Sequence, residues 1–598
     1  MTTQKEWLDK ITNARKVNQD WRSKFKTDMS RDYFEGKQNP GYPDDEWLTI
    51  NKIFTHVQSQ VPTLYSLDPY FYIKIKRSYN PSPEYIQECE MKAKIRQSYL
   101  NYLKEEIGLK EVVRMAILNA HFAFGVAKTR YAADDIENPE KGKPLTDGEG
   151  NTLTDETTGE PLLSPDTIPI NKRYVVDWVD ADDFIFDEDA GPLPASWKWV
   201  AQKIRTTREQ AKKNKNYNKK VIDQIAESVT PEKKGVVDKV LGAFKGKDPD
   251  KSKSEIIEFW EIYDLQNKKW LAISEDAKDP VMEPSDLPKG MGPHPFSILS
   301  FVKRIKSAYP MPPVYPGLDP AKEFNLARSR MMTHRKRFNR KYEVVFPKLT
   351  DDSEASKLES GDDGTIISVQ AFGAVNPIQD APLDQMNYQE IGLLNNDIIE
   401  CLGSPDAARG LATSDSATEA SIIDKRLEVR EGDRMSMVVD FVLDIAKKLD
   451  QLVQTHIDRD EAVKITGPQG EYWAHVREED YQDIQGDFEY SVSVGATQPR
   501  LPEIERSQWI AFISQVIIPM PHILTAPSFM KKMAELYHLD DENALEELRQ
   551  IGLKMMSGQM PMPGGKGGSQ PSENNPAAAI IGQAMGAIGG NNNGGGAH

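Results

Sequence analysis

A stretch of roughly 40 residues, 418–457, has the pattern of one uninterrupted helix. Apolar side chains recur along it at three- and four-residue steps, among them Ile423, Leu427, Leu449 and Val453. At ~1.5 Å per residue such a helix would span about 60 Å. This is longer than a typical globular helix, so the sequence predicts an elongated element.

The residues before this helix predict another helix followed by a small insert. An uninterrupted helical pattern covers 319–341, with Asp319 and Pro320 expected as the N-cap and the first helical residue. An insert with β-like composition follows over 342–384. The strand candidates within the insert are 344–346 and 365–369.

A second helical pattern covers 385–402. It is joined to the long helix by 403–416, a loop rich in glycine, serine, proline and alanine. A loop of this composition can move without breaking either of the helices it joins, although an ordinary connector would have the same appearance.

The rest of the chain predicts mixed helix and strand. Helical patterns cover 5–35 and 49–67, and 70–76 alternates like a strand with one solvated face. An acidic insert lies at about 134–170, with a turn-rich hairpin tip at 147–151. Further segments are strand-like residues within 463–496, helices over 503–553 and a glycine-rich end from 557. The expected fold class is therefore a multi-domain α+β protein.

The composition of the chain excludes some classes of function. The 598 residues include 75 lysines and arginines and 92 aspartates and glutamates, a formal net charge of −17. This balance argues against a protein that coats nucleic acid by charge neutralisation, but it permits nucleic acid to slide past. The two cysteines rule out a disulfide framework and fit a reducing cytoplasm. The N-terminus lacks a signal-peptide core and the longest apolar patch, 509–520, is too short for a bilayer, so no membrane insertion is expected.

Enzyme motifs are missing or incomplete. Residues 242–248 superficially resemble a phosphate loop, but one residue is missing between the glycines and Asp248 stands where Ser or Thr would bind magnesium. The acidic run 180–189 lacks the spacing of a calcium loop and is expected to be a solvated turn. His121 has apolar neighbours and is expected to pack in a core. The sequence therefore predicts no enzyme, no cofactor and no metal site.

A cluster of cations reverses the sign of charge locally. Between Phe324 and Tyr342 there are seven lysines and arginines and no acid. This exceeds what the C-terminus of a helix favours, and the cations do not form one narrow stripe. Contact with phosphate and pairing with acids of a neighbouring subunit remain equal interpretations. The cations are Arg328, Arg330, Arg335, Lys336, Arg337, Arg340 and Lys341.

The order helix, β insert, helix, loop and very long helix resembles the core of tailed-bacteriophage portal proteins. N-terminal segments are similar to the same family: Tyr-Phe-Glu-Gly-Lys-Gln at 33–38, an Asn-led helix at 51 and a Pro-led strand at 69. His294-Pro295-Phe296, Asn325 and Ser416 to Ala420 are also similar. The resemblance covers roughly residues 5–555, and the order of the motifs carries it because each motif alone is degenerate. The acidic insert and the glycine-rich tail are additions to the family pattern.

The resemblance implies a ring, usually of twelve copies, at one vertex of the capsid, through which double-stranded DNA is packaged and ejected. The family has no catalytic centre, because the terminase hydrolyses ATP. The implied partners are further copies of the chain, DNA, the terminase, a head–tail adaptor, and capsid and scaffolding proteins. The implied location is the virion, after assembly in the host cytoplasm.

The resemblance also divides the chain. Residues 1–318 and 458–499 would form the wing, 319–341 and 385–402 the stem, 342–384 the clip, 403–416 the tunnel loop, 417–457 the long helix behind the channel, 500–556 the crown and 557–598 a flexible tail.

Two sets of side chains become site candidates through the resemblance. Sparse basic rings in a mainly acidic channel would give weak, salt-sensitive contacts that DNA can pass. The channel candidates are the seven cations above with Arg409, Ser414 and Ser416. The candidates for partner binding on the clip are Lys348, Asp351, Asp352, Glu354 and Lys357.

Two alternatives remain. Another phage structural ring, such as a head–tail connector or a virion scaffold, would share the composition, but the order of elements favours a portal. A DNA-processing enzyme such as a terminase subunit would need a phosphate loop and a carboxylate cluster on strands, and neither is convincing.

Overall fold

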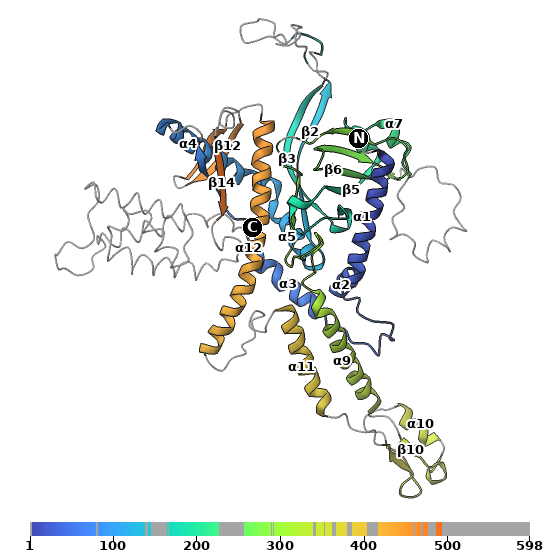
Figure 1. The fold of residues 1–598 in the computed structure, drawn as a ribbon. Coiled ribbons are helices and arrows are strands. Elements are labelled where there is room, and N and C mark those ends of the chain that lie inside the picture. Colours follow the sequence, from blue (N-terminus) through green and yellow to red (C-terminus); the bar gives the residue numbers. More distant parts are fainter. Residues whose placement is uncertain are drawn as a thin grey trace, which may run out of the picture.

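The computed structural model shows a protein of mixed helix and sheet (Figure 1). The predicted tunnel loop beyond Gly403, the crown and the tail lie outside the described residues. The structure describes residues 3–78, 82–137, 141–144, 164, 167–226, 256–288, 290, 292–338, 342–351, 353–360, 366–378, 385–403, 417–457, 461–467, 470–476 and 486–492.

The first predicted helix is two helices. α1 spans Gln4–Lys24, opened by a capping box between Thr3 and Glu6, and α2 spans Thr27–Phe34. The predicted single helix over 5–35 is wrong because Lys26 adopts the left-handed conformation, with φ of 49°. The break follows Phe25, which is buried with its ring 5.2 Å from that of Tyr315. Tertiary packing of Phe25 thus accompanies a turn that the local sequence does not signal.

A five-stranded antiparallel sheet lies beside α1, in the order β4-β5-β6-β7-β8. Alternate residues of its strands face opposite sides. One side packs on α1, where Trp7 meets Trp199 edge to face at 5.8 Å. The other side packs under α6 (Arg208–Lys213) and α7 (Lys219–Ile222). The strands are β4 (Phe184–Phe186), β5 (Trp199–Thr207), β6 (Ile256–Asp264), β7 (Lys269–Ile273) and β8 (Met282–Asp286).

The acidic insert lies within a long hairpin. β2 (Gly125–Glu137) and β3 (Thr167–Val179) pair antiparallel as far as Glu137 opposite Thr167, and β9 (Phe296–Leu299) pairs with the other edge of β2. The ends of the insert are therefore strands, and its predicted tip at 147–151 lies outside the described residues.

The largest core surrounds α12, which spans Ala417–His456 and has 40 residues. Its apolar stripe, including Val438, Phe441 and Leu449, is buried against helices from the N-terminal half. β1 pairs with β14 although the two strands are far apart in the sequence: Phe71 lies opposite Val492. The surrounding elements are α3 (Lys52–Leu64), α4 (Pro83–Ile107), α5 (Leu109–Phe122), β1 (Phe71–Ser78), β14 (Gly486–Val492) and the hairpin of β12 (Glu461–Gly467) and β13 (Gly470–Val476).

Two helices project from this body to a small distal unit (Figure 1). They are α9 (Leu318–Phe338) and α11 (Gln385–Leu402). α9 starts one residue before Asp319, directly after a 3₁₀ turn at Tyr315–Gly317, so the predicted N-cap is wrong. Asp319 lies instead in the first turn, where its carboxylate is 2.8 Å from the Lys26 ammonium.

The distal unit contains less strand than the sequence predicts. β10 (Tyr342–Val344) pairs with β11 (Val375–Pro377), and α10 (Ser353–Ser360) lies between them. In the described part of 365–369 there is no strand, only a single bridge between Val369 and Leu349. The strand predicted there is wrong, because the segment that pairs is Val375–Pro377.

Candidate nucleic-acid and partner interface

One face of α9 is bound by the segment that leads into α3. The side chain of Asn325 is fully buried, accepts a hydrogen bond from the Ile50 amide at 2.9 Å and donates one to Gln38. One helical turn later, the Ser329 hydroxyl accepts a hydrogen bond from the Leu48 amide at 2.9 Å. These buried contacts fix the rotation of α9 about its axis, and hence the direction in which each cation points.

The cations of α9 lie on different faces. At 3.6 residues per turn, Arg328 and Arg335 share a face, whereas Arg330 points to the opposite side. Arg328 is half-buried, and its Nε has no hydrogen-bond partner among the described residues. Lys336 is exposed and donates a hydrogen bond to the Asp45 carbonyl oxygen. Arg330 and Arg335 are exposed, so they are the two described arginines of the cluster that are most open to a polyanion or a partner.

Several predicted channel residues cannot be placed. Arg340, Lys341, Arg409, Ser414 and Ser416 lie outside the described residues. The backbone of Arg337 belongs to α9, but its side chain is not among those described. Their assignment to a channel stays a prediction.

The clip candidates form part of a local network. Glu354 and Lys357 are bridged at 2.8 Å one turn apart on α10, and Glu354 also accepts a hydrogen bond from the Ser368 amide at 3.1 Å. The Lys357 and Ser368 contacts lower the pKa of Glu354. Lys348 and Asp351 are exposed on the connection before α10, and Asp352 lies outside the described residues. Glu354 thus holds the chain after α10 in place, while Lys348 and Asp351 are presented outward.

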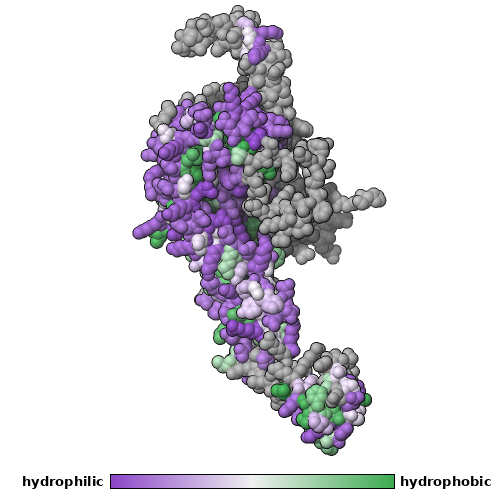
Figure 2. Space-filling model, turned by 90° about the vertical axis from the view of Figure 1, so that its right-hand side faces the viewer, coloured by the Kyte–Doolittle hydropathy of each residue, from purple (hydrophilic) through white to green (hydrophobic). Residues whose placement is uncertain are grey.

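The sequence prediction missed an exposed apolar surface on the same unit. Figure 2 shows hydrophobic side chains gathered at the end of the projection. Among its described residues, Leu349 and Ala374 are the buried ones, and Phe372 is fully exposed. Some of the apolar residues of this insert were predicted to lie on strands, and no spacing among them indicates a shared exposed surface. The exposed large apolar side chains are Tyr342, Phe346, Ile366, Val369, Phe372 and Ile378.

The sequence prediction also missed an acidic face on α11. Glu390, Asp397 and Glu400 are exposed, and the helix contains no lysine or arginine. Met386 and Leu393 lie between them and are also exposed. The signal was present in the spacing, because positions 386, 390, 393, 397 and 400 share one helical face.

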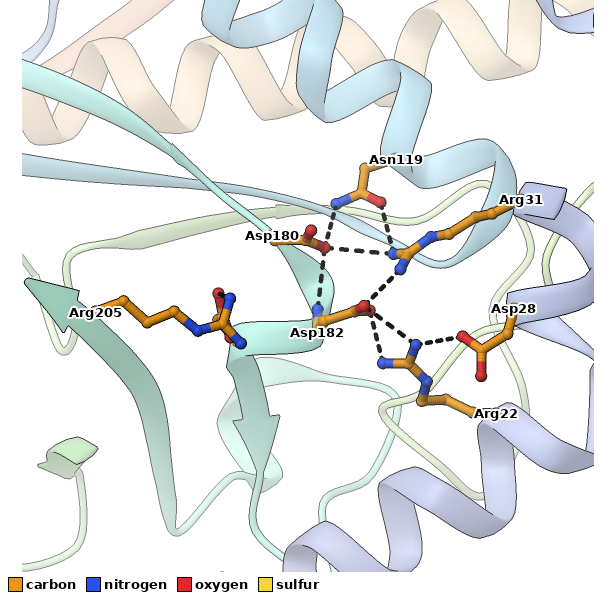
Figure 3. A network of polar contacts seen from close by, with 8 residues as sticks. Arg22, Asp28, Arg31, Asn119, Asp180, Asp182 and Arg205 are labelled. Atoms are coloured by element: carbon orange, nitrogen blue, oxygen red, sulfur yellow. Dashed lines mark hydrogen bonds and ion pairs between the residues drawn. The ribbon is translucent and has the colours of Figure 1, made fainter. Parts of the chain in front are cut away.

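The acidic run 180–189 is only in part the solvated turn that was predicted: Asp182, Glu188 and Asp189 are exposed, whereas Asp187 is buried. Figure 3 shows Asp180 and Asp182 facing two arginines from the first two helices. Asp182 is 2.6 Å from both Arg31 and Arg22, and Arg31 also reaches Asp180 at 3.3 Å. Burial alone would raise the pKa of Asp182, but the hydrogen bonds and charges of Arg31 and Arg22 lower it overall.

These aspartates therefore hold α1 and α2 against the start of β4. Asp187 has a similar structural role, because it is buried and accepts a hydrogen bond from the Lys198 amide at 2.8 Å. Within the described ranges, no group of three or more His, Cys, Asp or Glu side chains is placed to hold a metal ion.

His121 is packed in the core, as predicted. It is fully buried, with its ring 6.0 Å from His56 and 5.3 Å from Phe301. Burial lowers its pKa well below the ordinary value, and the charges of His56 and Arg434 act in the same direction. The imidazole is thus kept neutral at physiological pH.

The chain was compared with known proteins. No protein-family model matches it, and neither does any curated protein. Of the helices in the described part of the chain, none combines the length and the apolar character needed to cross a membrane.

Proposed function

We propose that the protein is a portal-type subunit. Copies of it would form a ring at one capsid vertex, conduct viral double-stranded DNA through the axis, and provide a docking platform for the terminase and a tail adaptor. The observation that carries the proposal is the projecting pair α9 and α11, with a small β-containing unit at its tip and the 40-residue α12 following in sequence. In a portal-type subunit, these parts would serve as the stem, the clip and the channel-backing helix.

The attachment of α12 to the body supports a role as a fixed support for the channel. Near its middle, Arg434 donates to Gln60 of α3 at 3.1 Å, and Gln60 donates to Glu431 at 3.0 Å. Nearly three turns later, Asp444 accepts a hydrogen bond from Ser297 of β9 at 2.6 Å. Polar contacts of defined geometry at successive levels oppose sliding of the helix along its axis.

The electrostatics support a passive conduit. A net charge of −17 per chain disfavours tight adhesion of DNA. A small number of cations per subunit, repeated around a ring, would give contacts that are weak and salt-sensitive. Arg335 is the described cation best suited to this role, because it is exposed and no ion pair joins it to another described residue.

Electron microscopy of the purified protein tests the proposal. The expected result is a ring in end views, with an axial opening wide enough for a DNA duplex. A closed ring without a through-hole would contradict the conduit and favour another virion scaffold. The docking role is tested separately, by binding of terminase and adaptor to rings with and without the substitutions Lys348→Glu and Asp351→Lys.

Two arginines test the contact with DNA. Arg335→Glu and Arg409→Glu should leave the ring intact but change the length of DNA packaged or its retention, because each substitution replaces a ring of cations by a ring of anions. Normal packaged length and retention in both variants would remove these arginines from the channel.

A further inference from the structure

The two projecting helices carry opposite charges. α9 has six lysines and arginines and two acids, a net charge of +4. α11 has three acids and no lysine or arginine, a net charge of −3. The helices lie side by side, yet no ion pair between described residues joins one to the other. Among the described residues, the charges of the two helices therefore do not neutralise each other.

The acidic face of α11 points away from the body. Asn395 marks the inner side, because its side chain accepts a hydrogen bond from Lys52 at 2.9 Å. Lys52 also lies over the ring of Phe324 on α9, at 5.2 Å. Leu393 and Asp397 are each two residues from Asn395, about 200° around the helix, so they lie on the opposite side.

α9 likewise has one side that is covered and another that is free. Asn325 and Ser329 mark the side covered by the N-terminal segment. Arg330 is about 120° from the centre of that side, and Lys322 is about 40° from it. Both side chains are exposed. The free faces of α9 and α11 are therefore complementary in charge but belong to different helices.

The heights of the charges match as well. Gly317 and Leu402 meet where α9 starts and α11 ends, since a Cβ on Gly317 would lie 2.5 Å from Leu402. Lys322 and Asp397 are each about five residues from this point, and Arg330 and Glu390 are each about twelve. A second copy rotated about an axis along the projection keeps these heights, so it would place Lys322 opposite Asp397 and Arg330 opposite Glu390.

We infer that the acidic face of α11 binds the basic face of α9 of a second copy of this chain. Leu393 lies between Glu390 and Asp397 on this face, and Met386 lies one turn before Glu390; both are exposed and give the contact apolar surface, which favours a protein partner over a water-filled channel. Because the two faces differ, the contact is heterologous and repeats from copy to copy, closing into a ring or continuing as a filament. The closed, ring-shaped form of this contact rests on the proposed function. What the inference adds is the surface through which neighbouring copies bind each other.

Paired charge reversals test this contact. One variant carries Glu390→Lys and Asp397→Lys, and the other carries Lys322→Glu and Arg330→Glu. Each alone places like charges opposite each other and should lose its oligomers in native mass spectrometry. A mixture of equal amounts restores opposite charges at every contact and should recover the wild-type mass. Asp9→Lys with Asp20→Lys, on exposed positions of α1, is the matched control, and circular dichroism checks the folding of each variant.

A third substitution gives the opposite effect. Glu323 is exposed beside Lys322, so it adds a negative charge to the basic face. Glu323→Lys should raise the salt concentration at which the oligomer dissociates, because surface ion pairs are screened by salt.

The outcomes separate this inference from the proposed function. If the wild type forms rings and both charge-reversal variants form them as well, the inference is overturned and the proposed ring is unaffected. Folded variants that dissociate and do not recover on mixing would also overturn it. If the wild type forms open filaments and the charge-reversal variants do not, the result would support the contact and contradict the portal ring. Intact rings with altered DNA passage would mean that the face lines the channel, which overturns the inference.

Discussion

Arg96 and Asp450 form an ion pair in which each side chain is only 1% exposed. The pair joins α4 to α12 across 354 positions of the sequence, with Nε of Arg96 at 3.2 Å from Oδ1 of Asp450. Tyr490 of β14 donates its hydroxyl to the same carboxylate at 2.6 Å, and the ring of Phe488 lies 4.5 Å from the guanidinium. Three distant parts of the chain therefore meet at one buried charge pair.

Removing one partner of this pair should be costly. Arg96→Met or Asp450→Asn should each lower the free energy of unfolding by about 3–5 kcal/mol, because an uncompensated charged group stays buried. The double variant Arg96→Met with Asp450→Asn should cost less than the sum of the two single losses. Chemical denaturation followed by circular dichroism measures all of these values. Additive losses would mean that the two side chains are not coupled.

The Asp182 network predicts a small, acid-sensitive contribution. The pKa of Asp182 is lowered in the folded state, so its contribution is present above the ordinary pKa of about 3.9 and is lost as the pH falls through the lowered value. Asp182→Asn should destabilise the protein at pH 7 by at most about 1 kcal/mol, since the side chain is one-third exposed and screened by solvent. The difference from wild type in urea midpoint should shrink as the pH falls below about 3.9 and vanish once the pH lies below the lowered value. A difference that grows on acidification would contradict this account.

Burial of His294 predicts that stability also depends on pH in a range above that of Asp182. Burial lowers its pKa to about 4, and the charge of Lys448 adds to this effect. The unfolded chain binds the proton near pH 6.5, so the folded protein should lose stability as the pH falls from about 6.5 to 4, by at most about 3 kcal/mol. His294→Phe keeps a ring next to Trp197, whose centroid is 5.8 Å away, and should remove that part of the loss. Parallel stability curves for the two proteins between pH 7 and 4 would refute the prediction.

The close approach of Gly317 to Leu402 can be tested by a double-mutant cycle. Gly317→Ala would place a Cβ 2.5 Å from the Leu402 side chain and should cost about 1–3 kcal/mol through overpacking. In a Leu402→Ala background the same substitution should cost less, because the obstructing methyl groups are gone. Hydrogen exchange of the α9 and α11 amides gives the local free energies. Equal costs in both backgrounds would place the strain elsewhere.

Local periodicity predicted the elements with the longest patterns. The helices over 319–341 and 385–402 and the long helix after 417 depend on spacings within the segment itself, and the structure has helices there. The break at Lys26 was missed because it follows from burial of Phe25 in a distant core. The pairing of β10 was missed because its partner, Val375–Pro377, has no strand signal of its own.

For the candidate site, the sequence predicted which charged residues are present but not which of them are exposed. The sequence identified the cations of α9, but which of them are covered depends on hydrogen bonds of Asn325 and Ser329 to residues more than 270 positions away. Asp180 and Asp182 looked unpartnered in the sequence because their arginine partner, Arg31, lies about 150 positions earlier. Exposure of apolar residues at the tip of the projection depends on how few neighbours surround them, which no local pattern encodes.

The pairing of β1 with β14 has a consequence for the timing of folding. During translation Phe71 must wait for Val492, roughly 400 residues later, which at 5–20 residues per second takes about 20–80 s. Until then, the edge of β1 and the binding site for Tyr490 on Asp450 stay open. A chain truncated before Gly486 could not complete this sheet, so β1 would keep an open edge on which another extended segment could pair.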